Sequence, residues 1–236
     1  YKKLGWQIFD SSSFFESYTM KIAITGFTGF IGKNILKKLI KHPIEIILLG
    51  RSVDKNYIKK GITFVKYDFY DNKKVSFSDI GSPDILIHLA WGGLDNYNSQ
   101  EHITKELPLH FSFLNNLIQT GLTNLIVAGT CLEYGMKNGE LHEDNYTYPI
   151  TSYGFAKDIL HRKLRAINIE KKLKLTWTRI FYVYGVNQKT KSIYSQFLEA
   201  IKKNEDFFPM SKGEQIRDYI DIETLASHMV NIAFFN

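Results

Sequence analysis

Cysteine is almost absent from this chain, since Cys131 is the only one among 236 residues. A single cysteine excludes an intrachain disulfide and is typical of a protein kept in a reducing compartment. No hydrophobic run approaches the roughly 18–20 residues that span a membrane. Residues 1–19 also lack the basic and apolar segments of a signal peptide. We therefore expect a cytoplasmic protein, in which Cys131 is a small buried residue after a strand.

The chain also lacks any basic run interleaved with aromatic residues, which is the pattern of a nucleic-acid groove. Its formal net charge is +6, but the lysines are scattered over what we interpret as solvated helix faces. This charge favours anionic ligands only mildly, and we predict neither nucleic-acid binding nor a metal site. A composition of 44% hydrophobic and 23% charged residues is typical of a globular protein with a full core.

A glycine-rich segment is the clearest local motif. Residues 26–32 read Gly-Phe-Thr-Gly-Phe-Ile-Gly, between an apolar run at 21–25 and an amphipathic helical pattern at 31–41. A strand that turns tightly into a helix in this way presents backbone N–H groups to a phosphate. The spacing G-x-x-G-x-x-G differs from that of most dinucleotide dehydrogenases, and an ordinary glycine turn is the alternative. We predict a cofactor loop with contacts from Gly26, Thr28, Gly29, Phe30, Ile31 and Gly32.

A second motif pairs Tyr153 with Lys157, and an apolar strand ending at Thr130 precedes it. Residues four apart share one face of a helix, so the phenol and the ammonium group lie side by side. A lysine cation favours the phenolate and would lower the pKa of Tyr153 from about 10. Tyr153 is therefore a candidate proton donor and acceptor near neutral pH.

The remaining pattern alternates strands with helices. Strands are expected at 44–49, 62–68, 85–90, 124–130 and 173–181, and helices at 107–120, 151–171 and 223–236. Such alternation predicts an α/β fold, a Rossmann doubly wound parallel sheet. We expect a linker or non-native extension at 1–19, an NAD(P)-binding domain at 20–182, and a small, C-terminally truncated substrate-binding region at 183–236.

Ligands of a doubly wound sheet bind beyond the carboxyl ends of its strands. In a site that prefers NAD, an acidic residue at the end of the second strand binds the ribose hydroxyls. Arg51 occupies that position here. An arginine can hold a 2′-phosphate, so NADP is favoured and NAD is the alternative; a solvent-facing Arg51 is the simpler interpretation. Asp68 would bond the adenine or merely start a turn. The strand ends predict cofactor contacts from Arg51, Asp68, Phe69, Leu89, Ala90 and Phe181.

These motifs together resemble the extended short-chain dehydrogenase/reductase family, also called the NAD-dependent epimerase/dehydratase family. The resemblance covers Met20 to the C-terminus and includes the Arg217-Asp218-Tyr219 segment. Residues 88–93, 129–135 and 179–185 are most similar to nucleotide-6-deoxysugar 4-ketoreductases of the dTDP-6-deoxy-L-talose 4-dehydrogenase type. Such enzymes combine a Rossmann domain with a smaller substrate domain.

The resemblance implies roles for individual residues. Thr130, Tyr153 and Lys157 match the catalytic Ser/Thr, the acid/base and its partner, which also bonds the nicotinamide ribose. Candidate substrate contacts are Trp91, Glu133, Tyr184 and Arg217. Trp91 and Tyr184 could instead serve only in packing. Arg217 could instead form a structural ion pair with Asp218 or Asp221.

The resemblance also implies a reaction. We expect an NAD(P)-dependent oxidoreductase that interconverts a nucleotide-linked 4-keto-6-deoxyhexose and its 4-hydroxy sugar, in deoxysugar or surface-polysaccharide biosynthesis. Dehydration is not expected, because Cys131-Leu132 replaces the Asp-Glu pair of the 4,6-dehydratases. The alternatives are an NAD-dependent nucleotide-sugar 4-epimerase and, with less support, a non-catalytic NADP-binding regulator. Family members commonly form homodimers through helices corresponding to 107–120 and 151–171.

Overall fold

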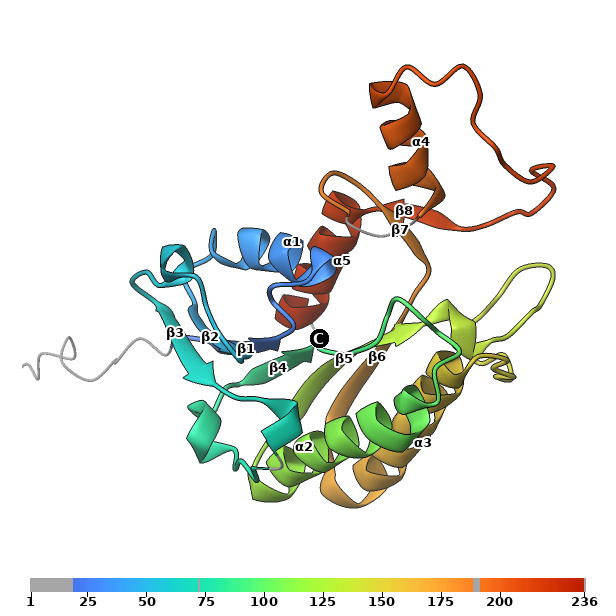
Figure 1. Ribbon diagram of the computed structural model, residues 1–236. Coiled ribbons are helices and arrows are strands. Elements are labelled where there is room, and N and C mark those ends of the chain that lie inside the picture. The colour runs from blue at the N-terminus through green and yellow to red at the C-terminus, as the bar shows by residue number, and fades with distance from the viewer. Residues whose placement is uncertain (1–18, 72, 189–191, 236) are drawn as a thin grey trace, which may run out of the picture.

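A six-stranded parallel sheet forms the centre of the protein, and its strands follow the order β3-β2-β1-β4-β5-β6 (Figure 1). The computed structural model describes residues 19–71, 73–188 and 192–235, so the expected linker at 1–19 lies almost wholly outside the described residues. The strands are β1 (Lys21–Thr25), β2 (Glu45–Gly50), β3 (Ile62–Lys66), β4 (Ile85–His88), β5 (Asn124–Thr130) and β6 (Lys174–Ile180). The order reverses between β1 and β4, which creates a crevice at the carboxyl ends of these strands.

Two helical layers cover the sheet. Helices α1 (Phe30–Leu39) and α5 (Ile222–Phe235) lie on one face, and α2 (Leu107–Thr120) and α3 (Ser152–Lys171) on the other (Figure 1). Side chains of β1 alternate between the two cores: Ile22 and Ile24 pack with α1 and α5, whereas Ala23 packs with α2 and α3. Both faces of β1 are therefore buried, which explains its nearly unbroken apolar sequence.

The last part of the chain divides between two places. Strands β7 (Tyr182–Tyr184) and β8 (Tyr219–Asp221) form a small parallel sheet, and α4 (Ile193–Lys202) extends beyond it as a lobe (Figure 1). Helix α5 then returns to the central sheet and packs on α1. The expected boundary at 182 therefore needs correction, because residues 222–235 belong to the Rossmann layers and the small lobe comprises only β7, α4 and β8.

Short helical turns connect the remaining elements. Three-residue 3₁₀ turns occur at Lys55–Tyr57, Phe69–Asp71, Ser78–Ile80 and Cys131–Glu133, and one π-helical turn at His102–Glu106 leads into α2. Strand β4 ends at His88 rather than at residue 90, because the Ala90 amide turns toward the Thr25 hydroxyl at 3.3 Å. No helix of the described part of the chain is long and apolar enough to cross a membrane.

Candidate active site

The loop after β1 has the geometry of a phosphate cradle. Gly26 adopts φ +70°, and a Cβ there would lie 2.7 Å from the Ala90 nitrogen, so only glycine fits. A Cβ on Gly32 would collide with the Gly26 carbonyl, which explains the close packing of α1 on β1. By contrast, a Cβ on Gly29 would make one tight contact, 3.3 Å from the Gly26 oxygen. Gly29 is otherwise exposed, so open space lies beyond that contact.

Helix α1 begins at this open space without a capping side chain. Gly29 is its N-cap, no side chain accepts a hydrogen bond from the first turn, and the first turn contains no acid. The uncapped N–H groups and the helix dipole suit an anion such as a pyrophosphate. Thr28 is exposed beside Gly29, while Phe30 and Ile31 form the partly buried first residues of the helix. These residues fit a dinucleotide.

The residues predicted to hold the adenosine half lie beyond β2 and β3. Arg51 is exposed directly after β2, and its charge acts on the Tyr70 phenol. The Asp68 carboxylate accepts the Tyr70 amide at 3.1 Å, so Asp68 does begin a turn. The Phe69 ring is partly buried and packs against the core, 5.0 Å from the Phe113 ring between centroids.

A capping turn places Thr130 at the carboxyl end of β5. The Thr130 hydroxyl accepts the Leu132 amide at 3.3 Å, and the Glu133 carboxylate accepts the Thr130 amide at 2.8 Å. Glu133 is fully buried, and its oxygens also accept from the Trp177 indole and the Arg179 guanidinium. The expectation that Glu133 binds a sugar hydroxyl is therefore wrong. This carboxylate is occupied within the fold and instead positions Thr130.

Tyr153 and Lys157 lie in the first two turns of α3, a helix that Thr151 caps. The Lys157 ammonium is 2% exposed and lies 4.3 Å from the centre of the Trp91 ring. Burial lowers the pKa of Lys157 to about 8. It also raises the pKa of Tyr153, with further contributions from Tyr97, Glu133 and Cys131. This corrects the expectation of a lowered Tyr153 pKa, because burial outweighs any effect of the neighbouring lysine.

Aromatic rings surround the Tyr153 phenol. Its ring stacks on Tyr97 with centroids 5.2 Å apart, and Trp91 and His102 lie 6.0 and 5.2 Å away. The Tyr153 amide also donates to the Tyr97 carbonyl at 2.9 Å. Sequence reasoning missed Tyr97 and His102 because residues 91–106 show no periodic pattern. The cluster of aromatic and histidine residues in that segment is the only signal that could have indicated them.

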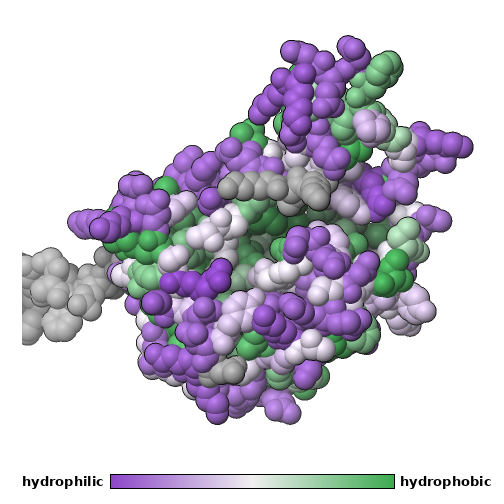
Figure 2. All heavy atoms as spheres, in the orientation of Figure 1, coloured by the Kyte–Doolittle hydropathy of each residue, from purple (hydrophilic) through white to green (hydrophobic). Residues whose placement is uncertain are grey.

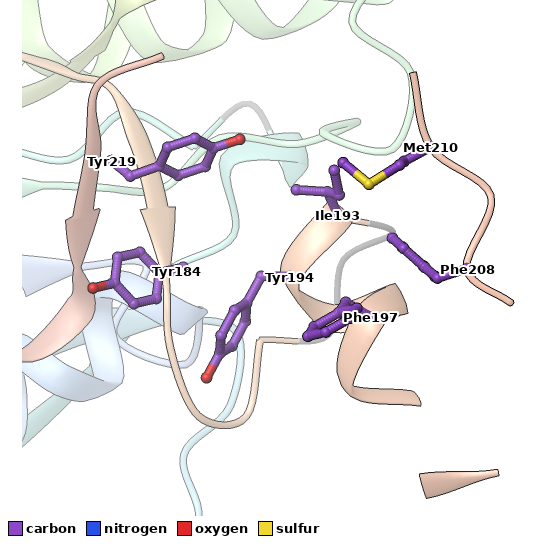
Figure 3. A pocket seen from close by; sticks show the side chains of 7 residues that line it. All are labelled: Tyr184, Ile193, Tyr194, Phe197, Phe208, Met210 and Tyr219. Carbon is purple, nitrogen blue, oxygen red and sulfur yellow. The ribbon is translucent and has the colours of Figure 1, made fainter. Parts of the chain in front are cut away.

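The predicted substrate contacts do not all meet in one place. Trp91 lies beside Lys157, whereas Tyr184 belongs to an apolar hollow of about 590 Å³ between β7, β8 and α4 (Figure 3). Figure 2 shows apolar residues gathered between the α4 lobe and the body of the molecule. Arg217 bonds the Tyr182 hydroxyl and Gln215 Oε1, and no ion pair with Asp218 or Asp221 occurs among the described residues.

The remaining predicted cofactor contacts lie at the ends of β4 and β6. The Leu89 and Ala90 amides face Thr25 Oγ1 at the crevice, and the Phe181 ring lies 6.2 Å from Tyr134. Within the described residues, no group of three or more His, Cys, Asp or Glu is arranged to hold a metal ion. The site that the structure brings together therefore comprises the glycine cradle, the end of β4, Thr130 and the Tyr153–Lys157 pair.

Several known proteins are similar to this chain in sequence or in fold. The dTDP-6-deoxy-L-talose 4-dehydrogenase (NAD(+)) of Aggregatibacter actinomycetemcomitans is 28% identical over 210 residues, which are 88% of this chain and 77% of that protein. A putative UDP-glucose 4-epimerase of Methanocaldococcus jannaschii is 25% identical over 219 residues, covering 87% and 70% of the two chains. A solved structure of UDP-glucuronic acid 4-epimerase from Bacillus cereus, with UDP-glucuronic acid and NAD, has TM-score 0.78 at 19% identity and covers 91% and 73%. This structural likeness confirms the Rossmann fold.

The family assignment rests on a match along almost the whole chain. The profile described as "NAD dependent epimerase/dehydratase family" matches residues 22–233, from β1 into α5. The matched range includes the glycine cradle, Thr130 and the Tyr153–Lys157 pair. The protein therefore belongs to the NAD-dependent epimerase/dehydratase family and is an enzyme of the extended short-chain dehydrogenase/reductase type.

Proposed function

We propose that the protein is an NAD(P)-dependent oxidoreductase that interconverts a nucleotide-linked 4-keto-6-deoxyhexose and its 4-hydroxy sugar, in deoxysugar or surface-polysaccharide biosynthesis. The supporting observation is that the start of α3, which carries Tyr153, packs against the turn that follows Thr130. A Cβ on Gly154, next to Tyr153, would lie only 2.6 Å from the carbonyl oxygen of Leu132, two residues after Thr130. The 28% identical relative is named for a 4-dehydrogenase of a 6-deoxyhexose, which supports this choice of substrate.

The side chains suit a proton transfer to an oxygen at C4. The bound dinucleotide would supply the hydride. Burial raises the pKa of Tyr153, so the phenol carries its proton at neutral pH and would give it to the more basic alkoxide oxygen that forms as hydride arrives. The Thr130 hydroxyl would hydrogen-bond the same oxygen. Lys157 would hold the cofactor ribose and give the phenol a cationic neighbour.

Substrate-dependent loss of NADPH or NADH absorbance with a dTDP-4-keto-6-deoxyhexose tests the reaction. Tyr153→Phe removes the donated proton, so we expect kcat to fall roughly 10²–10⁴-fold. Tyr146→Phe is the matched control, because Tyr146 is 91% exposed and the same hydroxyl is removed. Turnover that survives in Tyr153→Phe would contradict the assignment of the acid.

A nucleotide-sugar 4-epimerase is the second candidate, since the Methanocaldococcus relative is named as one. It would convert one 4-epimer into the other without net consumption of added dinucleotide. Product analysis by NMR in the absence of NADPH separates it from the oxidoreductase. Turnover of either kind would exclude a non-catalytic regulator.

We propose that Arg51 selects the cofactor. Its exposed side chain directly after β2 suits a 2′-phosphate, which favours NADP, whereas the 28% identical relative carries NAD(+) in its name. In Arg51→Ala we expect KM for NADPH to rise roughly 10–100-fold, because charged hydrogen bonds are lost. KM for NADH is expected to stay within about threefold. Equal effects on both cofactors would contradict the role of Arg51 in selecting between them.

The proposal also includes substrate contacts and assembly. We place the nucleotide sugar between Trp91 and the β7–β8–α4 lobe, with Tyr184 and Arg217 on the lobe side. We propose a homodimer through the outer faces of α2 and α3, where Phe155 is 44% and Ile169 is 87% exposed. Sedimentation of an Ile169→Glu variant tests that interface, and an unchanged dimer would exclude it.

A further inference from the structure

A buried chain of hydrogen bonds runs beneath the candidate site. Thr25 Oγ1 lies 2.9 Å from His88 Nδ1, and His88 Nε2 lies 3.0 Å from His110 Nδ1. His110 Nε2 lies 3.2 Å from Glu106 Oε2, and the Tyr70 hydroxyl donates to Glu106 Oε1 at 2.6 Å. Thr25 and His88 are fully buried, and His110 and Glu106 are 2% and 4% exposed. None of the expected catalytic roles uses this chain.

The carboxylate at one end determines the direction of every bond. Burial raises the pKa of Glu106, but hydrogen bonds from His110, Tyr70 and Gly92 lower it to about 2, so the group is ionised and only accepts. Burial lowers the pKa of both histidines, which are therefore neutral. His110 must then donate from Nε2 and accept at Nδ1.

The same reasoning continues along the chain. Because His110 Nδ1 carries no proton, His88 must donate to it from Nε2 and accept at Nδ1. The Thr25 hydroxyl is then the donor to His88. Its oxygen lone pairs are left to accept the amides of Leu89 and Ala90, at 3.2 and 3.3 Å. A single negative charge on Glu106 thus orients both imidazoles and Thr25.

Both ends of the chain hold one stretch of backbone, residues 89–92. Thr25 accepts the amides at its start, and Glu106 Oε2 accepts the Gly92 amide at 2.8 Å. Between them the Trp91 ring stacks on His110 with centroids 4.7 Å apart and an interplanar angle of 15°. Trp91 also contacts the Lys157 ammonium at 4.3 Å, the Tyr153 ring at 6.0 Å between centroids, and His102 Nδ1, which accepts its indole N–H at 3.1 Å.

Glu106 reaches this position through the π-helical turn His102–Glu106, which directly precedes α2. Turns of this type often occur at functional sites because they redirect side chains within a helix. Here the turn brings His102 and Glu106 to opposite ends of Trp91, since one accepts the indole N–H and the other the Gly92 amide.

We propose that Glu106 is a positioning residue of the active site: its carboxylate orients His110 and His88, fixes residues 89–92, and so holds the Trp91 ring against Lys157. It does not touch the substrate. Its effect on the reaction passes through Trp91 to the Lys157–Tyr153 pair, and through Ala90 to the cradle at Gly26.

The first test is independent of activity. In the full chain labelled with ¹⁵N, histidine correlation spectra at neutral pH report which ring nitrogen carries the proton. We expect the Nε2–H form for His88 and His110. In Glu106→Leu no acceptor faces His110 Nε2, so the Nδ1–H form, whose N–H can donate to His88 Nε2, is expected to become populated. An unchanged His110 tautomer in this variant would overturn the proposal.

The second test follows Lys157 by the ¹³Cε signals of labelled lysine. Glu106→Leu removes the acceptor for the Gly92 amide, so Trp91 loosens, water enters, and the apparent pKa of Lys157 is expected to rise from about 8 toward its ordinary value. Met229→Ala is the control for general destabilisation, because Met229 packs on the opposite face of the sheet. It is expected to lower Tm without changing either spectrum. An unchanged Lys157 titration in Glu106→Leu would contradict the link through Trp91.

The kinetic effect rests on the proposed function. In Glu106→Leu we expect kcat of sugar reduction to fall roughly 10–100-fold, because a displaced ammonium misplaces the reacting groups. Met229→Ala is expected to retain kcat. A normal kcat in Glu106→Leu with an altered His110 tautomer would overturn the positioning role. Absence of sugar reduction in the unmodified protein would instead overturn the proposed function, and the two spectroscopic tests would still decide the role of Glu106.

Discussion

Lys157 is the residue for which function and stability conflict most clearly. Its ammonium is almost fully buried against the Trp91 ring, and its pKa falls from the ordinary 10.5 to about 8. Below pH 8 both the folded and the unfolded chain carry the proton, so the full cost of the buried charge is present. As pH rises from 8 to 10.5 only the folded chain loses it, and the folded state gains stability.

Lys157→Met is therefore expected to raise the free energy of unfolding at pH 7 by about 1–3 kcal/mol while abolishing turnover. The advantage of the variant is expected to shrink between pH 8 and 10. Urea unfolding of both proteins across this range measures the difference, in which the tyrosine titrations common to both cancel. A constant difference would show that Lys157 is not desolvated in solution.

The three glycines of the cradle are expected to respond differently to a methyl group. In Gly29→Ala the Gly26 carbonyl need shift only slightly from its 3.3 Å contact, and we expect a cost of about 1 kcal/mol, because alanine is a poorer helix N-cap. The added methyl enters the open space, so Kd for NADH or NADPH is expected to rise about tenfold or more. Gly32→Ala collides with backbone and is expected to cost about 3 kcal/mol or more. Cofactor titration and urea unfolding check both; strong binding by Gly29→Ala would contradict the cradle.

The sequence predicts the position of a single residue well when that residue directly follows a strand. Thr130 and the cradle are placed by the rule that parallel strands end at one edge of the sheet, and the structure has them there. Glu133 shows the opposite case. Its spacing from Thr130 is that of a capping box, T-x-x-E, and this signal predicts a structural carboxylate rather than a sugar contact.

The turn of residues Cys131–Glu133 depends on one buried ion pair. Arg179 Nε donates to Glu133 Oε2 at 2.8 Å, and neither side chain is well exposed. Arg179→Met leaves a buried carboxylate without its cation, so we expect a loss of roughly 3–5 kcal/mol. Adding Glu133→Gln removes the uncompensated charge and is expected to recover about 1 kcal/mol or more.

Thermal unfolding of the two single variants and the double variant measures this coupling. The double variant also tests whether the Cys131–Glu133 turn still holds Thr130, because glutamine at position 133 keeps an acceptor for the Thr130 amide. If the two single losses simply add, the ion pair does not stabilise the turn.

Regular elements are the part of this fold that periodicity predicts well. Helices α2 and α3 were expected at 107–120 and 151–171 and occur at Leu107–Thr120 and Ser152–Lys171. The segment 91–106 was not predictable, because a π-helical turn has no repeat to detect and its shape depends on the Glu106–Gly92 bond. The residues that surround Tyr153 and Lys157 come largely from this segment, so the site was foreseen only in part.

At the scale of the molecule, an early part and a late part of the chain pack together. Helix α5 packs on α1, so the last described helix shares a core with β1. A division of the sequence at 182 could not reveal this, because the apolar face of a helix does not indicate which of two layers covers it. Between β7 and β8 the chain forms a lobe whose helix, α4, buries only Ala200. The α4 lobe is therefore held by fewer buried side chains than the helices of the Rossmann layers.

This difference predicts a gradient of local stability. A helix with few buried side chains opens at a small fraction of the global free energy of unfolding, whereas α2 and α3 open only with the core. We expect α4 amides to exchange with deuterium at least about 100-fold faster than those of α2, a gap of roughly 3 kcal/mol.

A nucleotide sugar bound between the lobe and Trp91 would slow α4 exchange while leaving α2 unchanged. Peptide-resolved exchange measured with and without dTDP-sugar tests both statements. Equal protection of α4 and α2 in the free protein would contradict the gradient, and an α4 rate that ignores the sugar would place the substrate elsewhere than on the lobe.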